Sequence, residues 1–185
     1  MFLATRPSSS VIERFLDASR HLPLTYEPVG LAQVGAPGYD IDETVVVIGR
    51  GRADFDRARA ALARWTHFDV GWVEVFPRHA AVGVGTNVAV LIRHLGFWSL
   101  NGARVVYHLK SSDARFGFAY GTLANHAERG EEIFEVAFEE GSGEVTYRLR
   151  AASRPRVALA RIGYPIARAL QARFRRDSGR VMSGR

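Results

Sequence analysis

The stretch from Arg115 to Glu132 reads RFGFAYGTLANHAERGEE, and it decides the fold. Successive side chains of a β-strand point to opposite faces. Read as a strand, the stretch has a bulky face of Phe116, Phe118, Tyr120 and Thr122 and a nearly bare face of Gly117, Ala119 and Gly121. Repeated small residues in a strand often mark the close approach of a helix, a ligand or another backbone. We therefore expect the bare face to leave room for a helix or a ligand.

Alternating apolar and polar residues continue on both sides of this stretch, which is typical of antiparallel strands. Six strands are predicted, and connections that contain glycine separate them. The strands are Val70–Phe76, Asn87–His94, Ala103–Leu109, Arg115–Leu123, Glu132–Glu139 and Glu144–Ala151. A β-branched run, Thr44–Ile48, predicts one more strand earlier in the chain.

The last predicted hairpin indicates its own register. One face stays apolar when the pairs are Phe138 with Val145, Val136 with Tyr147 and Phe134 with Leu149. A slip of one residue would set the same side chains against polar ones. The apolar register also places Glu135 opposite Arg148, a pair worth about 0.2 to 1 kcal/mol. This pair is interpreted as structural.

Helical signals lie at both ends of the chain. A capping-box pattern at Ser10 predicts a first helix to about Arg20, and Asp54 predicts the start of a second. Ser153, with Pro155 in the first turn, predicts a long C-terminal helix. Its predicted buried stripe is Leu159, Ile162, Ile166, Leu170, Phe174 and Val181, and its predicted kink lies at Gly163 and Pro165.

The predicted order of elements is strand, helix, six antiparallel strands and long helix. It resembles the helix-grip fold of the START and birch-pollen-allergen superfamily (Bet v-like, SRPBCC), in which a curved sheet wraps a terminal helix around a cavity. The resemblance implies an α+β fold with a curved antiparallel sheet of about seven strands. We expect one domain over residues 1–185, with residues 1–22 as an N-terminal helix and arm and residues 23–185 as the helix-grip domain.

Several segments resemble one narrower family. They are GWVEVFP at 71–77, VAVLIRHLGFWSLNGARVVY at 88–107, RFGFAYGTL at 115–123, ERGEE at 128–132 and RIGYPIARALQARFRRDS at 161–178. Together they resemble the family called domain of unknown function nineteen-ninety (DUF1990), over about Leu24 to Met182. Its members commonly read LPGHPE where residues 123–128 read LANHAE, so His126 and Glu128 are kept while both prolines are absent. The resemblance implies little about function.

Composition limits the chemistry and the partners. The chain has no cysteine, which excludes disulfides and thiolate sites. Residues 153–185 carry a net charge of +8, whereas the rest of the chain carries −2. No segment has the pattern of a secretion signal or a transmembrane helix, so we expect a soluble, cytoplasmic protein. Histidine spacing predicts no metal, and no cofactor motif is found.

The loop at residues 124–130 holds the first candidate site. His126, Glu128 and Tyr120 are predicted as a catalytic acid/base group, because histidine titrates near neutral pH and a carboxylate can set its tautomer. The alternative is a loop held together by hydrogen bonds. Predicted ligand-binding residues, which combine aromatic walls with a few polar tips, are Trp72, His94, Trp98, Tyr107, Phe118, Arg129, Tyr147 and Arg154.

Two functional hypotheses remain open at this point. The first is binding of a hydrophobic or amphipathic small molecule in an internal cavity, extended by analogy of fold to acid/base catalysis of the cyclase or dehydratase type. The alternative is an interaction module whose Arg-rich C-terminal helix binds nucleic acid or an anionic membrane. Steep loss of binding with added salt distinguishes the alternative from the first hypothesis.

Overall fold

The computed structural model describes residues 1–110, 112–155 and 164–184. The helices are α1 (Ser9–Ser19), α2 (Leu31–Val34), α3 (Gly51–Ala63), the short 3₁₀ helix η1 (Thr66–Phe68) and α5 (Tyr164–Met182). The strands are β1 (Phe2–Leu3), β2 (Asp40–Arg50), β3 (Val73–Phe76), β4 (Asn87–His94), β5 (Phe97–His108), β6 (Arg115–Thr122), β7 (Glu128–Glu139) and β8 (Glu144–Pro155). Among these residues, no helix is both long enough and apolar enough to cross a membrane.

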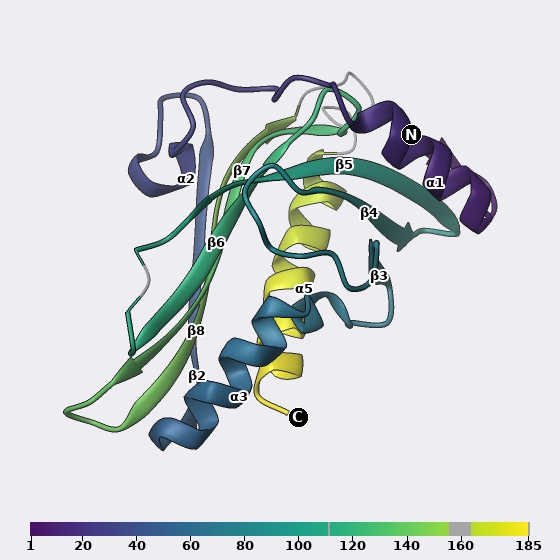
Figure 1. Cartoon of the computed structure of the whole chain (residues 1–185). Helices are drawn as coiled ribbons and strands as arrows, with labels where there is room; N and C mark the ends of the chain where they lie inside the picture. The colour runs from purple at the N-terminus through teal and green to yellow at the C-terminus, as the bar shows by residue number, and fades with distance from the viewer. Residues whose placement is uncertain (111, 156–163, 185) are drawn as a thin grey trace.

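The strands form one curved antiparallel sheet in the order β2-β8-β7-β6-β5-β4-β3, and β1 pairs with β5. The sheet curls around α5, which is drawn in yellow in Figure 1. The predicted α+β arrangement, a curved sheet around a C-terminal helix, is confirmed. The register of the last hairpin is confirmed too, because Phe138 pairs with Val145, Val136 with Tyr147 and Phe134 with Leu149.

The concave face of the sheet holds the main core. Bulky residues of β6, β7 and β8 pack there against one face of α3, which contributes Phe55, Ala58 and Leu62. Leu170 and Phe174 of α5 pack against the same core from the other helix. Burial of each such side chain contributes about 1.5 to 3 kcal/mol before conformational entropy is counted. Phe118 and Tyr120 belong to this face, as the alternation within β6 predicts.

The bare face of β6 is convex, and the expectation that it leaves room for the helix or a ligand is wrong. Tyr26 and the first residues of α2 cover it instead, since Tyr26, Leu31 and Ala32 form one packed cluster with Ala119. Glycine is favoured at position 121 because a Cβ atom there would overlap the Tyr26 hydroxyl unless that side chain shifts. Farther along the same face, α1 packs Ile12 against β4 and β5. Both faces of the sheet therefore carry packed segments, while Val45 and Val47 of β2 stay exposed.

The predicted start of the C-terminal helix is also wrong. Ser153 and Pro155 lie in β8, where Ser153 pairs with Asp40 on one side and Gly130 on the other. β8 lies inside the sheet, so its backbone groups gain more from ladder hydrogen bonds than from ending the strand. Pro155 is its last residue and lies beyond the pairing with β2, so β8 is an edge strand there, where proline is tolerated. Gly163 of the predicted kink and the stripe residues Leu159 and Ile162 lie outside the described residues. Pro165 lies in the first turn of α5, and the predicted stripe residue Ile166 is 47% exposed.

Candidate functional site

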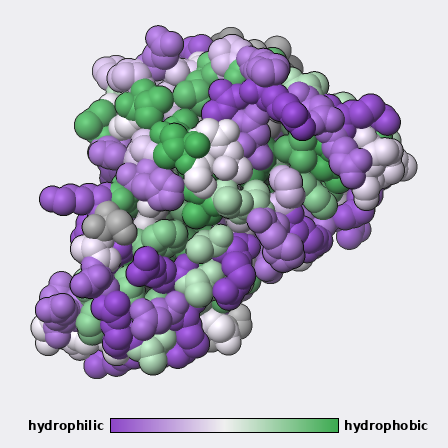
Figure 2. All heavy atoms as spheres, in the orientation of Figure 1, coloured by the Kyte–Doolittle hydropathy of each residue, from purple (hydrophilic) through white to green (hydrophobic). Residues whose placement is uncertain are grey.

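A cavity of about 620 Å³ lies between α5 and the concave face of the sheet. Its apolar walls come from η1, β3, β4 and α5 and include Phe68, Trp72, Val90, Leu170 and Phe174. In the space-filling view, hydrophobic residues gather in the middle of this face, within a mostly hydrophilic surround (Figure 2). Small-molecule sites are commonly apolar hollows of this size with a few polar groups.

Glu132 is the central polar group of the cavity. Its side chain points to the concave face of β7, as does that of Phe134 two residues later. Glu132 is partly exposed and lines the cavity. The hydroxyl of Tyr120 donates to its Oε2 at 2.7 Å. Burial is the main cause that raises the pKa of Glu132 to about 7, the charge of Glu128 adds to the shift, and Tyr120 and Arg175 oppose it. Near neutral pH the carboxyl is about half protonated.

Glu128 forms a second polar group where β7 begins. The side-chain amide of Gln171 on α5 donates to both of its carboxylate oxygens, at 2.9 and 3.0 Å, and to Ser153 Oγ at 3.2 Å. Burial raises the pKa of Glu128, while the Gln171 hydrogen bond and the charge of Arg168 lower it. Gln171 thus ties α5 to β7 and β8 at the polar end of the cavity.

Asp42 of β2 binds the arginines that α5 directs toward the sheet. Arg168 forms an ion pair with Asp42, and Arg175, which lines the cavity, forms another at 3.2 Å. The guanidinium of Arg175 is therefore already paired inside the protein. Its remaining effect on Glu132 is to lower the pKa of that carboxyl.

The loop candidate His126 lies on the cavity wall together with His94. The backbone N–H of Glu128 donates to Nδ1 of His126 at 3.0 Å, so a neutral His126 carries its proton on Nε2. His94 Nε2 lies 3.3 Å from Ser99 Oγ, and Asn101 donates to the same hydroxyl at 3.2 Å. These groups add polar atoms to the wall formed by β4, β5 and the loop.

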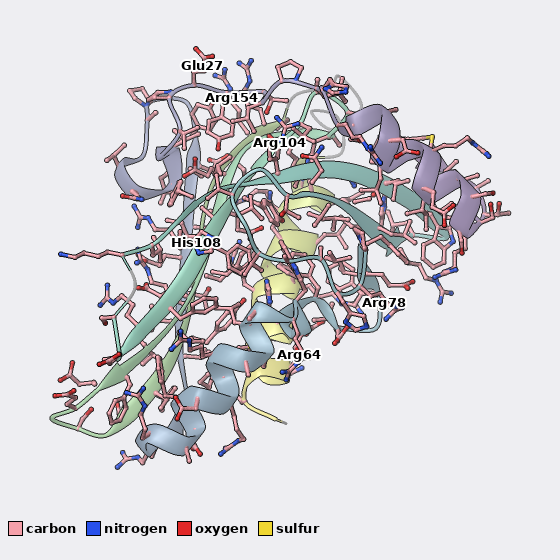
Figure 3. All side chains as sticks on the ribbon, viewed as in Figure 1. Glu27, Arg64, Arg78, Arg104, His108 and Arg154 are labelled. Carbon is pink, nitrogen blue, oxygen red and sulfur yellow. The ribbon has the colours of Figure 1, made fainter. Side chains whose placement is uncertain are left out.

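Five of the predicted site residues line the cavity: Tyr120, His126, Glu128, Trp72 and His94. The other six do not. Phe118 and Tyr147 are core residues. Arg129 lies beside the cavity residue Glu128 without lining the cavity itself. Arg154, labelled in Figure 3, stacks on Tyr39 at 4.6 Å from the ring centroid.

Trp98 and Tyr107 lie on the convex face, for two different reasons. Trp98 follows the regular alternation of β5 and packs with Leu100 beside α1. Tyr107 comes after an irregularity in the pairing of β5 with β6 between Val105 and Tyr107. An extra residue in one strand reverses the facing of the residues that follow. The hydroxyl of Tyr107 consequently donates to Glu131 at 2.6 Å, and Tyr107 itself does not line the cavity.

Glu132, Gln171 and Arg175 line the cavity, and sequence reasoning missed all three as site residues. A signal for Glu132 exists, because it continues the inward-facing series of Phe134, Val136 and Phe138 toward the start of β7. A carboxylate in an apolar series is unusual unless it is paired or functional. Gln171 and Arg175 follow one and five residues after Leu170 on a largely polar helix, so nothing marks them.

The arginines of α5 divide into two groups. Arg168 and Arg175 are held by Asp42, whereas Arg173, Arg176 and Arg180 surround Asp177 and are half or more exposed. One aspartate does not balance three arginines. The basic surface of the described part of this helix is therefore confined to its last turns.

Comparisons with known proteins identify the family. Residues 25–181 match the family model described as Domain of unknown function (DUF1990). The chain belongs to the DUF1990 family. A UPF0548 protein of Dictyostelium discoideum is 32% identical over 96% of this chain and 92% of its own length. A UPF0548 protein of Deinococcus radiodurans is 32% identical over 98% of this chain and 97% of its own length.

Solved structures of low sequence identity share the fold of this DUF1990 protein. The Zhui aromatase/cyclase from Streptomyces aligns with a TM-score of 0.55 at 14% identity, over 79% of this chain and 92% of that one. A START superfamily protein from Mycobacterium smegmatis aligns with a TM-score of 0.52 at 8% identity, over 80% and 96% of the two chains. The predicted helix-grip fold is thereby confirmed.

Proposed function

We propose that this protein binds a hydrophobic or amphipathic small molecule in the cavity beneath α5, and that Glu132 acts there as an acid/base group held by Tyr120. One observation carries the proposal: a cavity of about 620 Å³ with apolar walls contains a carboxyl group whose pKa is raised to about 7. Perturbed titratable groups inside clefts are frequent at functional sites.

The chemistry that suits this group is a proton transfer of the cyclase or dehydratase type. In a dehydration, a base removes a proton next to a carbonyl group and an acid delivers a proton to the departing hydroxyl, which leaves as water. A carboxyl with a pKa near 7 can take the first proton and return the second. Tyr120 positions Glu132, and Glu128 and His126 complete the polar wall. The fold shared with an aromatase/cyclase supports this reaction class by analogy.

The first test is native mass spectrometry of the protein purified from its own host, before and after denaturation and extraction. The expected result is one small organic molecule per chain. Ala167→Phe, which places a bulky side chain on the cavity wall, should lose that molecule, and Ala169→Phe, on the exposed side of the same helix, should keep it.

A second measurement covers weak or transient binding. The neutral fluorescent probe N-phenyl-1-naphthylamine should bind saturably and without salt dependence to the wild type and to Ala169→Phe, and much more weakly to Ala167→Phe. Equal probe binding by both variants would contradict the cavity as the site. If Glu132→Gln binds the extracted molecule but converts it as fast as the wild type, Glu132 is not the acid/base group.

A further inference from the structure

The acidic side chains of this protein have two kinds of hydrogen-bond partner. The basic residues are almost all arginines, since only Lys110 is a lysine. Several carboxylates away from the cavity pair with them: Glu135 with Arg115 and Arg148, Glu74 with Arg6 and Arg78, and Asp177 with three arginines of its own helix. In the described part of the chain, Glu128 and Glu132 have no such ion pair, and their hydrogen bonds come from an amide and a phenol.

Glu128 and Glu132 both line the cavity. Glu132 has one hydrogen bond, to Oε2, and its Oε1 receives none from the described residues. Buried carboxylates are ordinarily paired or fully hydrogen-bonded, because desolvation of an unpaired charge is costly. Arg175, the arginine on the cavity wall, pairs with Asp42, which also binds Arg168. The one positive charge by which these two arginines exceed Asp42 does not balance Glu128 and Glu132 when both are ionised.

Aromatic rings lie close to this polar end. Phe68 stands 5.0 Å from Phe174 and 6.2 Å from Tyr120, measured between ring centroids, and all three residues line the cavity. Aromatic faces attract cations, and they attract ammonium groups more strongly when water is excluded. Two carboxylates that repel each other, beside three aromatic rings, favour a ligand with a cationic group over one with a hydroxyl group. They disfavour a ligand with a carboxylic acid group.

We propose that the ligand of this cavity is an amphipathic amine, whose protonated nitrogen pairs with the free Oε1 of Glu132 while its apolar part fills the walls. This inference rests on the proposed function and names its substrate class. The field of Glu128 adds to the attraction. Amine binding supplies the missing positive charge and shifts the Glu132 proton equilibrium toward the carboxylate, the form in which the proposed acid/base group takes the first proton.

Affinity for the amine should then depend on pH through Glu132. The groups that act on this carboxyl are Tyr120 of β6, Tyr147 of β8, Glu128 of β7, Asp42 of β2, and Arg175 of α5. Simple alkylamines stay protonated up to about pH 10, as lysine does, so between about pH 6 and 8 the charge of the amine is constant while that of Glu132 changes. His94 and His126 line the same cavity, and Glu132→Gln separates their effect from that of Glu132. Amine affinity rises across this interval as the carboxyl ionises.

The test uses three probes with one skeleton: 4-phenylbutylamine, 4-phenylbutan-1-ol and 4-phenylbutanoic acid. Their affinities are measured by isothermal titration calorimetry on the wild type at about pH 6 and about pH 8. The amine should bind at least about ten-fold more tightly than the alcohol at the higher pH, the preference should shrink several-fold at the lower pH, and the acid should bind most weakly. Because this comparison uses only the wild-type protein at two pH values, it does not depend on whether any variant folds.

Two variants locate the preference. Glu132→Gln keeps the shape of the side chain and should bring the amine and the alcohol to within about two-fold of each other, without pH dependence. Glu140→Gln, on the exposed hairpin loop, should behave as the wild type. An amine that binds no better than the alcohol, or a preference that survives Glu132→Gln, overturns the inference while alcohol binding leaves the cavity proposal standing. If none of the three probes binds, the cavity proposal and the amine proposal both fail for small molecules of this phenylbutyl type.

Discussion

Two adjacent glutamates on β7, Glu131 and Glu132, have opposite environments because a strand directs neighbours to opposite faces. Glu131 is buried on the convex face and accepts four hydrogen bonds between 2.6 and 3.0 Å, from the hydroxyls of Tyr26 and Tyr107 and the backbone amides of Gly30 and Ala32. Glu132 on the concave face accepts one, from Tyr120. The first carboxylate binds a segment to the sheet, whereas the second is left open to a cavity.

Glu131→Ala is expected to have the largest effect. The substitution leaves two buried hydroxyls and two backbone amides without their acceptor, and hydrogen bonds to a charged group are worth about 1.5 to 3 kcal/mol each. Because such losses are not additive, we expect stability to fall by about 4 kcal/mol or more in urea-induced unfolding. Glu140→Ala on the exposed loop is the control. A loss below about 1 kcal/mol would show that Glu131 does not hold the segment.

His67 provides the second test, because it is an unpartnered polar group on the concave side that does not line the cavity. It is fully buried among Trp65, Phe68 and Phe134, neither of its ring nitrogens has a hydrogen-bond partner among the described residues, and burial lowers its pKa to about 3. The unfolded chain binds a proton below about pH 6.5 and the native state does not. Stability should therefore fall as the pH decreases from about 6.5 toward 3, by up to about 4 kcal/mol.

His67→Phe measures this contribution directly. Phenylalanine suits the aromatic surroundings and cannot titrate, so the variant should lose less stability than the wild type between about pH 7 and pH 4. The measurement is urea-induced unfolding at both values. Parallel pH profiles of the two proteins would mean that His67 finds a proton or a partner in the native state.

Glu132→Gln should show the opposite sign of pH dependence, with a smaller effect. The folded-state pKa of Glu132, about 7, exceeds its ordinary value of 4.5. The contribution of Glu132 to stability is therefore complete below about pH 4.5 and is lost as the pH rises through 7. Relative to the wild type, Glu132→Gln should gain up to about 3 kcal/mol between about pH 4.5 and pH 8. An unchanged difference across this interval would place the pKa of Glu132 near its ordinary value.

The sheet was predictable because alternation is a local property of the chain. Phe134, Val136 and Phe138 can face one core only in the register that the hairpin adopts. Positions after an irregularity were not predictable, and Tyr107 shows why: the shift beyond Val105 arises from pairing with β6 and leaves no mark in the local pattern. Ser153 misled for a related reason, since a helix cap and a strand residue look alike until the partner strands are known.

Part of the candidate site could be predicted from the sequence. Tyr120, His126 and Glu128 could be grouped because they are close in the sequence and the hairpin of β6 and β7 brings them together. Gln171 and the cavity itself depend on how α5 lies across the sheet, which is a long-range contact. The cover of the bare face by Tyr26 is equally long-range, so its small residues were correctly read as a close approach but assigned to the wrong neighbour.

Gly121→Ala tests that neighbour and should have the smallest effect of this series. The added methyl group overlaps the Tyr26 hydroxyl, which its hydrogen bond to Glu131 holds in place, so we expect a loss of about 1 to 3 kcal/mol. Gly141→Ala, whose methyl group would meet no atom closer than 3.5 Å, is the matched control in urea-induced unfolding. In a double-mutant cycle, Tyr26→Phe should reduce the cost of Gly121→Ala, since the hydroxyl is the atom most closely approached. If the stability losses of the two single substitutions simply add in the double variant, the residues on the convex face move to make room for the methyl group. Glu131 is then held less rigidly than its four hydrogen bonds imply.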